Sequence, residues 1–173
     1  YLKNEEKIFT EGNTKALIKS KYELKSKNII FFKNTLEIYS NDSTIISDYN
    51  NNLYKLSKFY YSINNEQLKG EKIIVTTNYN LPKSNSFYFS SAIINLQNQD
   101  FIAKDPEIKI YKDIFDNSEN DPRVKGISSI KKDNVTIVKK GLFTSCKETD
   151  GCPPWSIKAD EIKHDRNEKQ LIY

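Results

Sequence analysis

The 173-residue sequence contains no methionine, one tryptophan, one histidine, two cysteines and five glycines. Because it has no initiator methionine, we expect the chain to be a processed or excised part of a longer protein. No apolar run approaches the ~18 residues that a membrane-spanning helix needs. The glycines do not cluster, which excludes the glycine-rich loops that cradle phosphate groups. The two cysteines are compatible with an oxidising compartment.

The single histidine limits the catalytic chemistry. A serine–histidine–aspartate triad would have to use His164, which lies in a Lys-His-Asp-Arg turn where we expect a solvated charge. Zinc ligation by Cys146, Cys152 and His164 fits by residue type, but their spacing matches no zinc-finger pattern. The adjacent carboxylates Asp160 and Glu161 would point to opposite faces of a strand, so they could not act together as a general acid and a general base. We therefore expect a protein that is not an enzyme and that holds no metal and no cofactor.

The composition is polar but not that of a disordered chain, with 37% hydrophobic and 29% charged residues. Aromatic residues reach 12%, nearly all of them tyrosine and phenylalanine, which favours strands over helices. The net charge of +4 comes mainly from dispersed lysines. It fits attraction to anionic surfaces or phosphorylated lipids, and equally a bias towards lysine and asparagine. No compact basic block is interleaved with aromatics, so we expect no nucleic-acid binding.

Short apolar runs separated by turn residues extend along most of the chain, whereas residues 1–13 are charged and unpatterned and are expected to form a flexible segment. Many runs alternate between apolar and polar residues, as Phe59, Tyr61 and Ile63 do, which indicates strands with one apolar face. The interval 113–125 has no pattern and is expected to be a loop. The runs comprise residues 16–24, 28–32, 36–39, 43–47, 53–63, 72–77, 86–96, 101–103, 107–111, 134–138 and 142–144. The expected turns are 50–52, 64–65, 69–70, 98–100 and 132–134.

The sequence therefore predicts an all-β fold with about a dozen or more short strands. A weak internal sequence similarity between Ser90-x-x-Ile93 and Ala159-x-x-Ile162 suggests a solenoid-like roll of similar hairpins. Chance explains this similarity equally well. Two arrangements of the apolar faces stay open at this point. The sheets can seal into an ordinary β-sandwich core, or they can stay splayed and leave an apolar trough for a ligand.

The C-terminal stretch carries a resemblance to a known family. After Phe143-Thr-Ser-Cys146 the sequence continues with Trp155-Ser-Ile-Lys-Ala159, then Glu161-Ile162, His164-Asp165-Arg166 and Glu168. These residues resemble the end of the N-terminal periplasmic domain of the LptD (OstA) family of lipopolysaccharide-assembly proteins. About thirty residues match well, and Asp121-Pro-Arg-Val-Lys-Gly126 resembles the same family more loosely.

The resemblance implies an open β-jellyroll over residues 14–173 that stands on the periplasmic side of the outer membrane. In that family the domain accepts lipopolysaccharide from the bridge protein LptA and passes it to an outer-membrane barrel plugged by the lipoprotein LptE. The chain would then be cut before the expected barrel. The alternatives are a bridge component of the LptA or LptC type, and a closed structural β-solenoid without a lipid ligand.

The resemblance also gives expected roles to individual residues. Acyl chains would lie among inward-facing residues, for which alternation suggests Leu36, Ile38, Ile45, Phe59, Tyr61, Ile63, Ile73, Val75, Phe87, Phe89, Ile93, Val135, Ile137 and Ile157. LptA would add its strand to an edge around residues 14–24, with Ala16, Ile18, Tyr22 and Leu24 as the expected edge residues. Cys146 matches the family's cysteine, which in many members is bonded to the barrel. Because this chain also has Cys152, a local Cys146–Cys152 disulfide is expected, with pairing to the barrel as the alternative.

Overall fold

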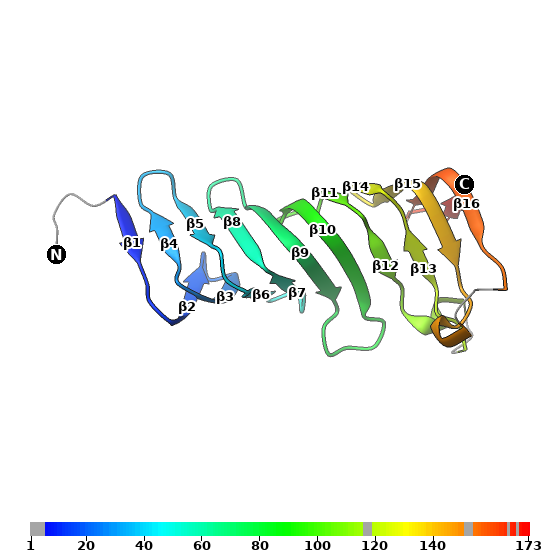
Figure 1. The fold of residues 1–173 in the computed structure, drawn as a ribbon, viewed down its shortest axis with the longest axis horizontal. Coiled ribbons are helices and arrows are strands. Elements are labelled where there is room, and N and C mark those ends of the chain that lie inside the picture. Colours follow the sequence, from blue (N-terminus) through cyan, green and yellow to red (C-terminus); the bar gives the residue numbers. More distant parts are fainter. Residues whose placement is uncertain (1–5, 116–118, 151–153, 166, 169) are drawn as a thin grey trace.

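The computed structural model describes residues 6–115, 119–150, 154–165, 167–168 and 170–173 of the chain. These residues form seventeen antiparallel strands and two short 3-10 turns. The strands stack side by side along the long axis, with the N-terminus at one end and the C-terminus at the other (Figure 1). The all-β fold class is confirmed, and the arrangement fits a jellyroll-like fold.

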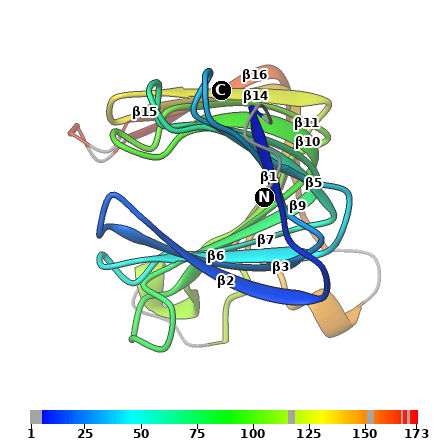
Figure 2. The ribbon, with the colours of Figure 1, turned by 90° about the vertical axis from the view of Figure 1, so that its left-hand side faces the viewer.

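Two layers of strands face each other, and the profile of the ribbon seen along its axis resembles a letter C (Figure 2). The strand pairings define the two layers. The layer that carries β14 at the top of Figure 2 holds β1 (Lys7–Phe9), β4 (Ile30–Phe32), β5 (Glu37–Ser40), β8 (Lys58–Ser62), β11 (Phe101–Lys104), β14 (Ser128–Lys132) and β17 (Gln170–Ile172), and we call it the upper layer. The lower layer holds β2 (Asn13–Ile18), β3 (Tyr22–Lys27), β6 (Thr44–Asp48), β7 (Leu53–Leu56), β12 (Glu107–Lys109) and β13 (Arg123–Lys125). The 3-10 turns are η1 (Lys112–Phe115) and η2 (Glu148–Asp150).

Four long strands belong to both layers: β9 (Gln67–Thr77), β10 (Asn85–Asn95), β15 (Val135–Thr144) and β16 (Ile157–Asp165). The first part of β9 pairs with β8 of the upper layer, and its last part pairs with β7 of the lower layer. Lys72 in β9 and Lys140 in β15 have positive φ angles of 48° and 49°. Such left-handed residues bend a strand sharply, so they carry these strands from one layer into the other.

All other crossings between the layers lie on the same side as these bends. We call this side the fold edge. It contains residues 10–12, 28–29, 41–43, 57, 72, 90, 105–106, 126–127, 140 and 160. The hairpin turns lie on the opposite side, which we call the mouth, and several of them contain left-handed residues such as Lys19, Asn51, Glu66 and Asp133.

Three expectations about local structure are wrong. Residues 7–9 form β1, which pairs with β4, although they lie in the segment expected to be flexible. The expected loop 113–125 contains part of η1 and all of β13, whose three residues pair with both β12 and β15. Residues 69–70 lie within β9 rather than in a turn. A side chain on Gly70 would bring its Cβ within 2.7 Å of the Lys58 carbonyl oxygen, so glycine serves close packing there.

Candidate functional site

The apolar side chains of the two layers meet in the space between them, which we call the trough. On β6, for example, Thr44 and Ile46 are buried whereas Ile45 is exposed on the outside. The same alternation holds on β10, where Phe87 and Phe89 face the trough. Since most strands contribute alternate residues, the trough runs along the molecule as one continuous apolar cluster.

Large side chains fill the N-terminal half of the trough, which we define as the part built by β1 to β8. Tyr54, Phe59 and Tyr61 are at most 2% exposed. The ring of Tyr22 packs edge-on against Tyr61, with ring centroids 6.3 Å apart. Phenol and phenyl rings from both layers therefore occupy this half, and it is packed as a core.

The C-terminal half, built by β9 to β17, contains a cavity of about 920 Å³. Its apolar wall consists of Phe87, Ile108, Ile110, Ile114, Val124, Val138, Phe143, Ile162 and Leu171, which come from both layers. Its polar lining consists of Asn50, Asn52, Thr77, Asn78, Asn85, Gln99, Tyr111, Thr136, His164 and Gln170. An apolar wall with a polar border suits a ligand that has an apolar and a polar part.

An aromatic cluster stands at the border between the two halves. Phe89 and Phe101 have ring centroids 5.0 Å apart, and Phe87 lies 6.2 Å from Phe101. Phe87 also lines the cavity, so the aromatic cluster adjoins it. Phe87 and Phe89 were expected to face inward, and both are buried in the shared core.

Most residues expected to face inward do so. Seven of them are buried in the core and two are partly buried against it, and they extend over both halves of the trough. They are Ile38, Phe59, Tyr61, Ile73, Val75, Phe87 and Phe89, with Ile63 and Ile157 packed against the cluster. Their placement in the trough agrees with the expectation, and a role in binding acyl chains stays a prediction.

Five residues that were expected to face inward do not. Leu36 lies in the turn between β4 and β5, where its positive φ of 54° takes it out of the strand pattern. The other four lie on the outer faces of strands, because the neighbouring residue of the same strand occupies the trough instead. They are Ile45 beside buried Ile46, Ile93 beside buried Ile94, and Val135 and Ile137 beside buried Thr136 and Val138. Ile93 is therefore not equivalent to buried Ile162, and the weak sequence similarity between their segments does not correspond to a structural repeat.

The expected edge segment 14–24 is a hairpin rather than one strand. β2 pairs with β3, and among the described residues it has no second partner, so Ala16 and Ile18 lie on an edge strand. Tyr22 and Leu24 lie on β3, which pairs with both β2 and β6 and is therefore internal. The expectation is wrong for these two residues, because the turn at 19–21 reverses the chain between them and β2.

His164 lies in β16 and lines the cavity, whereas the sequence suggested a solvated charge in a turn. It is half-buried and stands opposite Thr136 of β15 and Leu171 of β17. Cys146 follows the other end of β15, so the β15–β16 ladder separates it from His164. This separation argues against the zinc site that was considered from the sequence. The alternation from Trp155 to Asp160 predicts the first part of this strand, and only its end at Lys163, His164 and Asp165 was misread as a turn, because those residues are all polar or charged.

Hydrogen bonds anchor the segment that carries the family resemblance. Thr144 Oγ1 donates to the Trp155 carbonyl oxygen at 2.8 Å, and the Phe143 and Trp155 rings meet edge-on with centroids 5.8 Å apart. The guanidinium of Arg123 donates to the carbonyl oxygens of Asp121 and Cys146. Cys152 lies outside the described residues, and the expected Cys146–Cys152 disulfide stays a prediction.

The mouth of the N-terminal half is bridged by one carboxylate. Glu66 lies in the turn between β8 and β9. Its carboxylate accepts a hydrogen bond of 3.0 Å from the Lys19 ammonium and one of 3.1 Å from the Tyr22 hydroxyl. Lys19 and Tyr22 belong to the β2–β3 hairpin of the lower layer, so these contacts join the two layers at the mouth. The hydrogen bond from Lys19 holds the pKa of Glu66 below its ordinary value. Burial, together with the bond to Glu66, raises the pKa of Tyr22.

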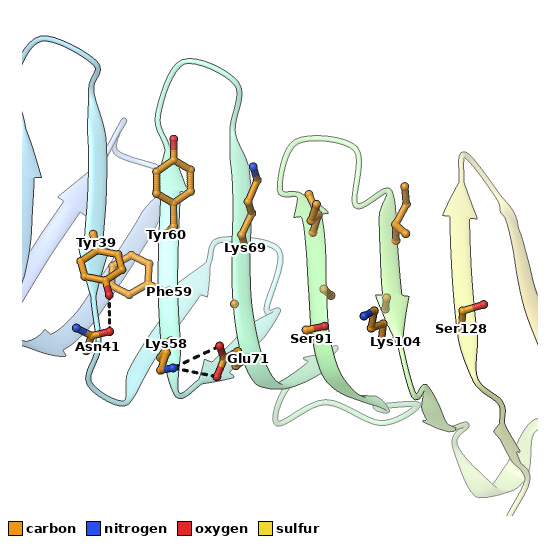
Figure 3. A pocket seen from close by; sticks show the side chains of 15 residues that line it. Tyr39, Asn41, Lys58, Phe59, Tyr60, Lys69, Glu71, Ser91, Lys104 and Ser128 are labelled. Carbon is orange, nitrogen blue, oxygen red and sulfur yellow. Dashed lines mark hydrogen bonds and ion pairs between the residues drawn. The ribbon is translucent and has the colours of Figure 1, made fainter.

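A second, shallower depression of about 790 Å³ lies on the outside of the upper layer (Figure 3). Tyr60 and Lys69 stand side by side on β8 and β9, with the ammonium 5.5 Å from the ring centroid. Ile93 and Ile102 continue this row across β10 and β11, and they are 40% and 60% exposed.

No family model matches the sequence, and no curated protein matches it either. Within the described residues, no helix is long and apolar enough to cross a membrane.

Proposed function

We propose that this chain is a periplasmic lipid-transfer domain, not an enzyme, that accepts lipopolysaccharide from an LptA-like bridge. The domain would shield the acyl chains in its trough and pass them to an outer-membrane translocon with an LptE-like plug. The observation that carries the proposal is the cavity of about 920 Å³ between the layers, with its apolar wall and polar border. The resemblance of the C-terminal segment to the LptD family supports the same proposal.

The energetics of the trough favour acyl chains as the ligand. Each methylene group that leaves water for an apolar wall contributes about 0.8 kcal/mol. The wall supplies phenylalanine, isoleucine and valine side chains from both layers, and the polar border leaves a place for a hydrated headgroup. A closed sandwich would offer no such space, so the cavity favours the splayed arrangement over the sealed one.

The experiment is photocrosslinking of purified lipopolysaccharide to a probe residue at Phe87, with a probe at Tyr88 as the matched control. Phe87 lines the cavity, whereas Tyr88 lies on the other face of the same strand. We expect crosslinking at Phe87 and not at Tyr88. Crosslinking at neither position, or at Tyr88 alone, would contradict a lipid site in the trough and favour a structural roll without ligand.

The partner strand of the bridge protein would add to the free edge of β2. Consecutive residues of a strand point their N–H groups to opposite sides, so of Lys15 and Ala16 one faces β3 and the other faces the free edge. Proline at the residue that faces the free edge should abolish assembly with LptA and leave the stability of the domain unchanged. Proline at the other residue should lower the stability. If both prolines reduce stability and assembly in parallel, strand addition at β2 is wrong.

A further inference from the structure

The two halves of the trough differ in how their layers are joined at the fold edge. In the N-terminal half, the chain crosses between the layers in the short connections 10–12, 28–29, 41–43 and 57. In the C-terminal half, the continuous strands β9, β10, β15 and β16 cross as well. Loops bend more easily than hydrogen-bonded strands, so the layers of the N-terminal half can separate more readily.

Small hydroxyl side chains line the inside of this looser fold edge. Ser26 and Thr44 share a hydrogen bond of 2.7 Å, and Ser40 donates to the Lys27 carbonyl oxygen at 2.7 Å. All three side chains are buried. Hydroxyl groups can exchange partners during a small rotation, which suits a hinge better than interlocked apolar side chains do.

On the mouth side, the two layers of this half are held by Glu66. Its side chain is only 9% exposed, and its carboxylate binds Lys19 and Tyr22, with the Lys21 ammonium 4.0 Å away. Because the carboxylate is shielded from water, salt screens these contacts less than it screens a surface ion pair. The contacts of Lys19 and Tyr22 with Glu66 span 47 and 44 residues of sequence and join the lower-layer hairpin to the upper-layer turn.

The packing behind this bridge contains one unsatisfied group. The Tyr61 hydroxyl is buried and has no hydrogen-bond partner among the described residues. Its ring contacts Tyr22, whose hydroxyl binds Glu66. If the two layers separated at the mouth, water could hydrogen-bond to the Tyr61 hydroxyl. This new hydrogen bond would offset part of the free-energy cost of separating the layers.

We propose that Lys19, Tyr22 and Glu66 form a gate that holds the mouth of the N-terminal half closed and opens by hinge motion at the fold edge. In the open state an acyl chain can enter the half of the trough that the tyrosines fill in the closed state. The gate itself is a property of the fold, and its use by acyl chains rests on the proposed function.

The first test measures access to the trough without any lipid. In a background with both natural cysteines replaced by serine, Leu68→Cys places a thiol in the buried core at the start of β9, opposite Tyr61 of the N-terminal half and two residues from Glu66. Phe143→Cys places one at the cavity of the C-terminal half. Glu66→Gln should speed the reaction of Cys-substituted position 68 with a maleimide about tenfold, because it removes charged hydrogen bonds. The rate at position 143 should stay unchanged.

The control is Glu71→Gln, which removes the exposed ion pair between Lys58 and Glu71 on the outer face. It should alter neither rate. An equal acceleration at both positions by Glu66→Gln would show general destabilisation and would overturn the gate, as would an unchanged rate at position 68.

The second test uses purified lipopolysaccharide and photocrosslinking probes at positions 68 and 143. Glu66→Gln should raise crosslinking at 68 and leave crosslinking at 143 unchanged. If neither position crosslinks while the maleimide reaction at 68 still accelerates, the gate stands and the lipid function fails. If both positions crosslink equally in both proteins, the gate does not control access to the N-terminal half.

Discussion

Truncation of two adjacent isoleucines of β6 tests how the strand faces are assigned. Ile46 is 1% exposed and stands opposite Leu24 and Tyr54, whereas Ile45 is 38% exposed on the outer face. Ile46→Ala removes three carbon atoms from the trough, each worth about 0.8 kcal/mol, and leaves a cavity behind. We expect a loss of about 3 kcal/mol in the free energy of unfolding.

Ile45→Ala is the matched control, because it changes the same residue type on the same strand. It loses strand propensity and little burial, so we expect a loss of about 1 kcal/mol or less. Urea denaturation of both variants measures the difference, and thermal unfolding should show Ile46→Ala melting about 6–12 °C lower than the parent. Equal losses for the two variants, or a larger loss for Ile45→Ala, would refute the assignment of faces on β6.

Three further predictions concern other parts of the fold. Gly126→Ala should lower the free energy of unfolding by about 2 kcal/mol or more in urea denaturation, because its Cβ would lie 2.4 Å from Val138 Cγ1; an unchanged midpoint would contradict the packing. The Lys19 contact lowers the pKa of Glu66, so its stabilisation is present above pH 4.5 and is lost as the pH falls through the lowered pKa. Glu66→Gln should therefore lose less stability than the parent in acid titration, and parallel curves would speak against the contact. Arg123→Met should cost about 2 kcal/mol, because two carbonyl oxygens lose a charged donor; a loss below about 0.5 kcal/mol would show that these bonds are dispensable.

Alternation in the sequence was enough to establish the all-β fold and many of the inward residues. It succeeded where one face of a strand is apolar and the other is polar, as around Phe87 and Phe89. It failed where both faces carry apolar residues, as at Ile45-Ile46 and Ile93-Ile94. A period of two leaves both choices open in such a pair, and pairing with the neighbouring strands decides between them.

The sequence by itself determined most of the strands, most of the turns and the residue types that build the trough, because these depend on patterns of a few neighbouring residues. Only the tertiary structure decided that the layers stay apart in one half and close in the other. It also brought Lys19 and Glu66 together, 47 residues apart, and placed His164 at the cavity. These features depend on how many strands stack and where the long strands bend, and no local pattern encodes the distance between residues on different layers.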